Sequence, residues 1–204
     1  MALRLYAVTF LEGLAPVAVD GTAIVPVRDL AAVVEEAPYV MSLPDDEALA
    51  RHHEVTSATL ARAGAVLPAP AGTVFRSVES LRQWLELHYV ALNDALAYVE
   101  DRVEARIHVA RADASEDERE AGTDLAAAST EIFRVLRRQA VASFALRTEH
   151  VTGLALTSAF LVERELWKEF TALARTEGER QEGIDLSITG PWPPYDFVRI
   201  HFGG

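Results

Sequence analysis

The chain has 204 residues, half of them hydrophobic, which is enough to fill one large or two small cores. Its net charge of −12 argues against binding nucleic acid or an anionic membrane through a basic face, so a protein partner is favoured. The absence of cysteine excludes disulfides, thiolate nucleophiles and zinc–thiolate sites, and it fits a reducing compartment.

The first part of the chain is rich in strand formers, broken by glycine and proline. Three segments are predicted to be extended: Leu3–Phe10, Thr22–Val27 and Asp29–Glu35. A helix is expected next, with Ser42 as N-cap, ending at Gly64. Val66–Phe75 is again extended, and its prolines place it at a sheet edge or a bulge.

From Ser77 onward the apolar residues recur every three or four positions as far as Val103. This spacing predicts one long amphipathic helix, roughly 40 Å in length. Such a helix would join two lobes. We therefore divide the chain into an N-terminal α+β lobe (1–76), a connecting helix (77–103) and a C-terminal lobe (104–204).

The C-terminal lobe has a more regular pattern. Its predicted strands are Ala105–Ala110, Phe144–Thr148, Leu154–Val162 and an alternating segment from Ile184 to Ile188. Ser115 and Glu118 form a capping box that opens one helix, and Leu166, Phe170 and Leu173 mark the other. The order β-α-β-β-α-β is that of a ferredoxin-like sandwich, so we predict the α+β class with a ferredoxin-like C-terminal lobe.

Neither a membrane span nor a secretory signal is expected. The longest apolar stretch, Val151–Val162, is far shorter than the roughly 20 residues that cross a bilayer. The apolar run at the N-terminus is interrupted at Glu12. We therefore expect a cytosolic protein.

Two clusters of polar residues have both a functional and a structural interpretation. His52 and His53 could bind a metal, but adjacent helical residues point about 100° apart, so one histidine is expected to pack and the other to be solvated. An acidic cluster could hold calcium, but it lacks the calcium-loop spacing and favours initiation of a helix. This cluster comprises Asp113, Glu116, Asp117, Glu118 and Glu120.

No phosphate-binding loop, dinucleotide-binding glycine motif or nucleophile elbow occurs in the chain. We therefore expect no catalytic residue, no bound metal, no cofactor and no small-molecule substrate.

The least probable segment lies near the C-terminus, and its candidate interaction residues are Gly190, Pro191, Trp192, Pro193, Pro194, Tyr195 and Phe197. Its prolines fix φ and remove backbone donors, which predicts a stiff turn. Trp192 and Tyr195 are expected to project from this turn. They would either dock a partner or pack against their own lobe as a C-terminal clamp.

Thr189–Val198 resembles the proline-tryptophan motif of the GvpF/GvpL family of gas vesicle proteins. Six shorter segments also resemble family markers, in family order: Leu5–Val8, Asp29–Val34, Arg51–Val55, Val66–Pro68, Gly72–Phe75 and Ala159–Val162. One departure is Ala69-Pro70-Ala71, where the family usually carries methionine, arginine and phenylalanine, so roles tied to those residues are not carried over.

The resemblance implies two α+β lobes and a non-enzymatic role in the gas vesicle. The implied partners are the small hydrophobic shell protein of the GvpA type and other accessory gas vesicle proteins. The alternative is an enzyme or small-molecule-binding domain on a ferredoxin-like scaffold. That alternative predicts a deep pocket with convergent polar groups near His52, His88 or His108.

Overall fold

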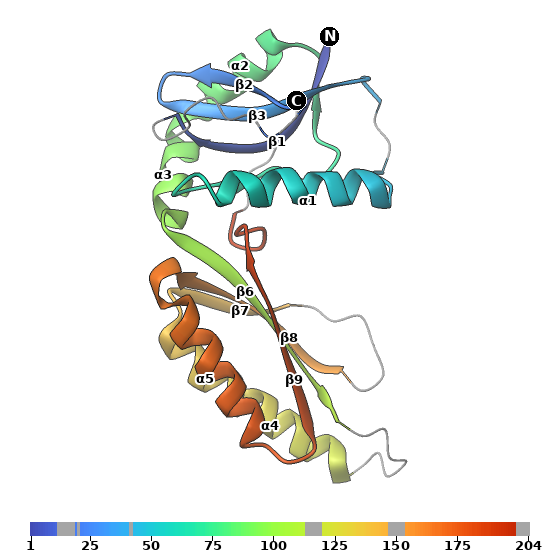
Figure 1. Cartoon of the computed structure of the whole chain (residues 1–204), viewed down its shortest axis with the longest axis vertical. Coiled ribbons are helices and arrows are strands. Elements are labelled where there is room, and N and C mark those ends of the chain that lie inside the picture. The colour runs from blue at the N-terminus through green and yellow to red at the C-terminus, as the bar shows by residue number, and fades with distance from the viewer. Residues whose placement is uncertain (12–18, 20, 41–42, 113–119, 147–153, 199–204) are drawn as a thin grey trace. The chain divides into compact units, whose positions relative to one another are not determined.

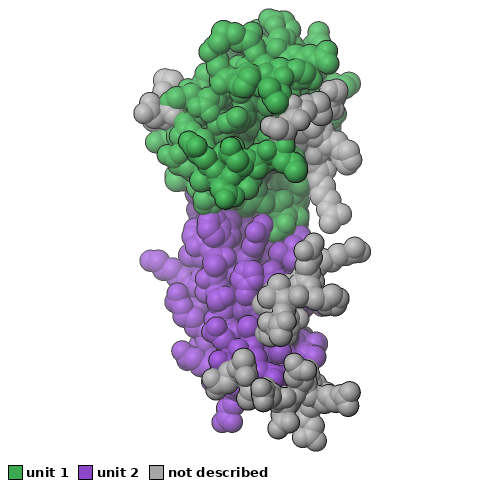
Figure 2. All heavy atoms as spheres, turned by 90° about the vertical axis from the view of Figure 1, so that its right-hand side faces the viewer, with its two compact units in different colours: residues 1–101, 193–204 green, residues 102–192 purple. Residues whose placement is uncertain are grey.

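The computed structural model describes residues 1–11, 19, 21–40, 43–112, 120–146 and 154–198. This part of the chain forms five α-helices and two antiparallel sheets, which confirms the predicted mixture of helices and strands (Figure 1). The chain divides into two compact units (Figure 2). Unit 1 contains Met1–Asp101 and Pro193–Gly204, and unit 2 contains Arg102–Trp192.

The sheet of unit 1 is built from five strands, which lie where the sequence predicts extended chain. They are β1 (Ala2–Phe10), β2 (Ala23–Val27), β3 (Leu30–Ala37), β4 (Leu67–Pro68) and β5 (Val74–Phe75). The strand order is β2-β3-β1-β4, and β5 also pairs with β1. The proline-containing β4 therefore stands at an edge, where a missing backbone donor is tolerated.

Helices cover both faces of this sheet. They are α1 (Asp46–Leu60), α2 (Val78–Leu87) and α3 (Tyr89–Val99). Figure 1 shows α1 on one side of the sheet and α2 on the other. The larger core lies between the sheet and the α2–α3 pair, and a smaller one lies beneath α1.

A bulge in β1 allows side chains of this one strand to pack into both cores of unit 1. The register with β3 shifts after Leu5, so the alternation of side chains changes phase there. Leu3, Leu5 and Val8 consequently share the core under α2 and α3, although their spacing is not strictly even. Tyr6 points to the opposite face and packs with Val55 of α1.

The structure corrects the predicted single helix over 77–103. The segment forms two helices, because the chain leaves helical geometry at His88, whose φ and ψ are −100° and 10°. The His88 Nδ1 lies 2.8 Å from the Trp84 carbonyl oxygen, and the two rings stack with centroids 4.7 Å apart. The second helix ends at Val99, and both helices belong to unit 1.

The N-cap predicted for the first helix is also corrected. Asp45 caps α1, because its carboxylate accepts a hydrogen bond of 2.9 Å from the Ala48 backbone N–H. Asp46 and Glu47 follow in the first turn, where negative charge favours the helix N-terminus. Ser42, the predicted cap, lies outside the described residues.

Unit 2 has the predicted order of elements. They are β6 (Arg102–Arg111), α4 (Glu120–Leu136), β7 (Ala142–Leu146), β8 (Leu154–Glu163), α5 (Trp167–Glu179) and β9 (Ile184–Trp192). Short 3-10 turns follow α4 (Arg137–Gln139) and precede α5 (Arg164–Leu166). The sheet order is β7-β8-β6-β9, with every neighbouring pair antiparallel.

Both helices of unit 2 lie on the same side of its sheet (Figure 1). The core is centred on Phe160 of β8, whose ring lies 5.5 Å from Phe133 of α4 and 5.4 Å from Phe170 of α5. Ile184, Leu186 and Ile188 pack against the same core, so the predicted alternation of the last strand is confirmed.

Some predicted features cannot be placed. The Ser115–Glu118 capping box and the acidic cluster from 113 to 118 lie outside the described residues, although Glu120 begins α4. Among the helices that the structure describes, none combines the length and the apolar character that a membrane crossing requires.

Gly178 of α5 offers a test of this packing. A Cβ at this position would lie only 2.9 Å from the Cβ of Leu186 on β9. We expect Gly178→Ala to lower the free energy of unfolding by about 1–3 kcal/mol, because overpacking outweighs the gain in helix propensity. Urea unfolding measures the change, with the exposed Arg175→Ala as control. A more stable Gly178→Ala protein would contradict the close packing.

Candidate functional site

The C-terminal motif is divided between the two units. Gly190 to Trp192 are the last residues of β9, and Pro193 onward belongs to unit 1. The predicted turn therefore starts later than the sequence suggests. Pro191 is compatible with a strand because β9 stands at the edge of the sheet, where β6 is its one partner among the described strands.

Gly190 is required by close packing as well as by its backbone. Its φ is +127°, a region that side chains rarely allow. A Cβ here would stand 2.7 Å from the Glu104 carbonyl oxygen and 2.8 Å from the Trp167 ring. The β6–β9 register shifts at this point, between Glu104 and Arg106, so the glycine lies in a bulge.

An ion pair between a buried carboxylate and a half-buried arginine lies next to this bulge. Glu104 has no exposed surface, and its carboxylate accepts a hydrogen bond of 2.7 Å from the Arg106 Nε. Trp192 pairs with Glu104 across the strands, and its indole N–H donates to the Thr189 hydroxyl at 3.0 Å. Because Glu104 is paired, its burial leaves no uncompensated charge.

After Trp192 the chain turns and packs into unit 1. Pro193 and Pro194 are buried, and the Tyr195 N–H donates to the Pro193 carbonyl at 2.7 Å. The Tyr195 hydroxyl lies 2.5 Å from the Thr56 hydroxyl of α1. Thr56 already directs its own proton to the His52 carbonyl at 2.8 Å, so Tyr195 is the donor.

Tyr195 therefore contacts α1 of unit 1, whereas the clamp was expected to pack against the C-terminal lobe. Val198, just beyond the motif, packs against the large core of unit 1. Trp192, Tyr195 and Phe197 are each half-buried. Docking of a partner on these residues stays a prediction.

The two adjacent histidines of α1 have different surroundings. His52 is 5% exposed, and its ring centroid lies 5.5 Å from that of Tyr6. His53 is half-buried, with its Nε2 3.4 Å from the Ser57 hydroxyl. The two rings thus face different environments, as expected for neighbouring helical residues.

Burial lowers the pKa of His52 to about 4, and the nearby Ala69 backbone opposes this shift only in part. The positive charges of Arg4 and His53 lower the pKa further. Neither ring nitrogen reaches hydrogen-bonding geometry with a described residue. At neutral pH the imidazole is therefore uncharged.

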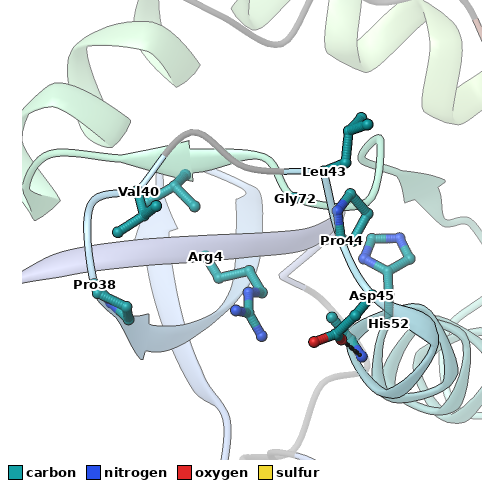
Figure 3. A pocket seen from close by; sticks show the side chains of 10 residues that line it. Arg4, Pro38, Val40, Leu43, Pro44, Asp45, His52 and Gly72 are labelled. Atoms are coloured by element: carbon teal, nitrogen blue, oxygen red, sulfur yellow. Dashed lines mark hydrogen bonds between the residues drawn. The ribbon is translucent and has the colours of Figure 1, made fainter.

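His52 also lines a cavity of about 140 Å³ (Figure 3). The cavity lies at the N-terminus of α1, and its other lining residues come from β1, from positions 38, 40, 43 and 44, and from the turn before β5. Its polar side chains are Arg4, Asp45 and His52, and Pro38, Val40 and Leu43 are among its apolar ones (Figure 3).

The three histidines named as pocket candidates do not converge. His88 stands at the junction of α2 and α3, which cover the opposite face of the sheet from His52. His108 lies in unit 2 on β6, with its Nδ1 3.1 Å from the Thr157 hydroxyl, and burial lowers its pKa. Among the described residues, no group of three His, Asp or Glu side chains could hold a metal ion.

Sequence reasoning missed Arg4 as a member of the cavity. The one available signal was a cation inside the apolar first strand, in the run Leu3-Arg4-Leu5-Tyr6. A charged residue at that position must reach solvent or a polar group, because an unpaired buried charge is costly.

The contact between Tyr195 and Thr56 predicts a measurable coupling. We expect Tyr195→Phe and Thr56→Val each to lower the free energy of unfolding, with a coupling of about 0.5–1.5 kcal/mol in the double mutant. Denaturant unfolding of the four proteins measures this coupling. Additive effects of the two substitutions would show that the hydroxyl pair does not hold the segment.

The low pKa of His52 predicts acid sensitivity. The unfolded chain binds the proton near pH 6.5 and the folded protein only near pH 4, so stability is lost as the pH falls through this window. The loss is at most about 3 kcal/mol. His52→Leu should flatten the stability profile between pH 6.5 and 4, whereas the control His53→Gln should not. An unchanged profile in His52→Leu would refute the assignment.

Comparisons with known proteins agree on one family. The family model described as gas vesicle synthesis protein GvpL/GvpF matches residues 4–125 and 114–199. Gas vesicle protein F2 of Halobacterium salinarum is 29% identical over 196 residues, covering 91% of this chain and 86% of that protein. Gas vesicle protein F of Haloferax mediterranei is 28% identical over 182 residues, covering 86% and 81%.

Solved structures show the same fold. The crystal structure of the gas vesicle protein GvpF from Anabaena sp. PCC7120 has a TM-score of 0.76 at 17% identity, covering 98% of both chains. That of GvpF from Microcystis aeruginosa has a TM-score of 0.75 at 16% identity, covering 98% of this chain and 99% of the other. With family matches along almost its whole length, the chain belongs to the GvpL/GvpF family of gas vesicle proteins.

Proposed function

We propose that this protein is a non-enzymatic structural or assembly protein of the gas vesicle. It acts in the cytoplasm, where it binds the small hydrophobic shell subunit and other accessory gas vesicle proteins. The observation that carries the proposal is the family match along nearly the whole chain. Curated relatives of similar length bear the name gas vesicle protein F, which supports the same role.

The surface chemistry supports a role in handling an apolar subunit. A net charge of −12 keeps copies of the chain apart, while local apolar side chains remain available. At the junction of α2 and α3, Leu87 is 81% exposed and Val90 is 70% exposed. An apolar partner would gain free energy by covering such side chains.

We infer that unit 2 is a ferredoxin-like sandwich. The supporting observations are the order β-α-β-β-α-β, the sheet order β7-β8-β6-β9 and two helices on the same side of the sheet. We further propose that the N-terminal domain extends through α3 and is completed by Pro193–Val198. This division replaces the separate connecting helix of the sequence-based proposal.

The second candidate function, small-molecule binding, is favoured by the cavity at His52. That cavity lies in unit 1, at one of the three histidines near which the sequence places a pocket. Small-molecule binding at this place is compatible with an assembly role, because the two would use different chemical groups.

Co-purification with the shell subunit tests the proposed function. We expect the tagged wild-type chain to retain the co-expressed shell subunit, and Trp192→Ala or Tyr195→Ala to retain several-fold less if the motif docks it. Circular dichroism of each variant separates lost docking from lost folding. Leu87→Ala is compared with these variants, and it tests whether the exposed side chains at the α2–α3 junction contribute to retention of the shell subunit.

In a vesicle-forming cell, deletion of the chain should abolish or deform the vesicles, and the wild-type chain should restore them. Normal vesicles after deletion, together with no captured shell subunit, would contradict the assembly role.

A further inference from the structure

The cavity beside the N-terminus of α1 contains a polar group that its surroundings leave unsatisfied. His52 is nineteen-twentieths buried and lines the cavity, yet neither of its ring nitrogens has a hydrogen-bond partner among the described residues. A neutral imidazole offers one N–H donor and one nitrogen acceptor. Buried polar groups in native proteins are nearly always paired, so a molecule in the cavity is the expected partner.

Arg4 gives the cavity a cation, and its charge also acts on the neighbouring Tyr6 hydroxyl. No carboxylate of the described chain lies within ion-pair distance of its guanidinium. The neighbouring Glu35 already accepts a hydrogen bond from Tyr6 and lies 3.7 Å from Arg51. A guanidinium presents a planar fork of donors that matches a carboxylate.

Asp45 is the acidic side chain of the cavity, and its charge is already engaged. Its carboxylate accepts the Ala48 N–H at 2.9 Å as the cap of α1. The positive end of the helix dipole offsets a carboxylate in this position. The cation of Arg4 and the imidazole of His52 therefore decide which ligand the cavity favours (Figure 3).

We propose that this cavity binds a compact carboxylate, held by the Arg4 guanidinium and by the His52 ring. The proposal does not depend on the gas vesicle role. The carboxylate belongs either to a small free acid or to the C-terminus of a peptide, because both present the same group.

The size and the walls of the cavity limit the ligand. A cavity of about 150 Å³ admits a molecule as large as benzene, so roughly six non-hydrogen atoms fit the 140 Å³ available. Pro44 and Val74, both half-buried, supply an apolar wall. A carboxylate with a short alkyl stem therefore satisfies both the polar and the apolar sides.

Titration of the wild-type chain with butyrate, followed by NMR of the His52 ring, tests the proposal. Butyramide is the matched probe, because it has the same size and no charge. At constant ionic strength, butyrate should cause a saturable shift of the His52 signals, and butyramide should bind at least tenfold more weakly. Equal binding of the two probes, or no saturable shift with butyrate, would overturn the proposal.

Variants of Arg4 test whether its guanidinium binds the carboxylate. Arg4→Gln should weaken butyrate binding at least tenfold, and Arg4→Lys should retain most of it. The exposed Arg82→Gln on α2 makes the same charge change elsewhere and should have no effect. An equal loss in Arg82→Gln would show that only the overall charge matters and would overturn the role of Arg4. The comparison of the two probes on the wild-type chain does not depend on the folding of any variant.

A second pair of probes distinguishes the sources of the carboxylate. N-acetyl-Gly-Gly-Val is titrated with a free and with an amidated C-terminus. Tighter binding of the free peptide than of butyrate assigns the site to a protein C-terminus, and weaker binding assigns it to a small acid. Equal binding of the free and amidated peptides, alongside equal binding of butyrate and butyramide, would refute carboxylate recognition altogether.

Discussion

The return of the chain to unit 1 after Trp192 is the constraint on which the rest of the structure depends. Unit 1 contains residues from both ends of the sequence, because the chain enters unit 2 after Asp101 and leaves it at Trp192. The hydroxyl contact between Tyr195 and Thr56 joins positions 139 residues apart. Closing a loop of this length costs conformational entropy that the contact must offset. Unit 1 is therefore incomplete without the residues that follow unit 2 in the chain.

The bulge of β1 at Tyr6 provides the second organising feature. It separates the side chains that fill the core under α2 and α3 from those that pack in the smaller core under α1. Without the change of phase, Val8 would leave the large core, because a one-residue shift moves a side chain to the other face. The same strand thus builds a dry core on one side and carries Arg4 to the cavity beside His52 on the other.

Much of the fold was predictable from local pattern, and what was missed depends on tertiary contacts. The alternation of Ile184, Leu186 and Ile188 identifies the last strand, because one face of that strand is buried. The helix break at His88 was missed, since the apolar spacing continues unchanged through it and the residue carries no breaker signal. Asp45 was taken as a first-turn residue, although the helix begins one position after it. The cavity at His52 was predicted only as an alternative, because its polar groups come from positions 4, 45 and 52.

The two halves of the C-terminal motif make different structural contacts. A substitution in one half is therefore expected to affect a different part of the molecule from a substitution in the other. Gly190 and Pro191 lie near the end of an edge strand beside the buried Glu104, where a side chain on the glycine would strike backbone. Pro193, Pro194 and Tyr195 instead close unit 1 against α1. Trp192 lies between these two halves. It is half-buried, and its indole N–H donates a hydrogen bond to the Thr189 hydroxyl of the same strand. Loss of Tyr195 therefore acts first on unit 1, and loss of Trp192 acts first on the end of β9. A shared role of Trp192 and Tyr195 in binding a partner requires that both residues contact the partner in addition to making these structural contacts.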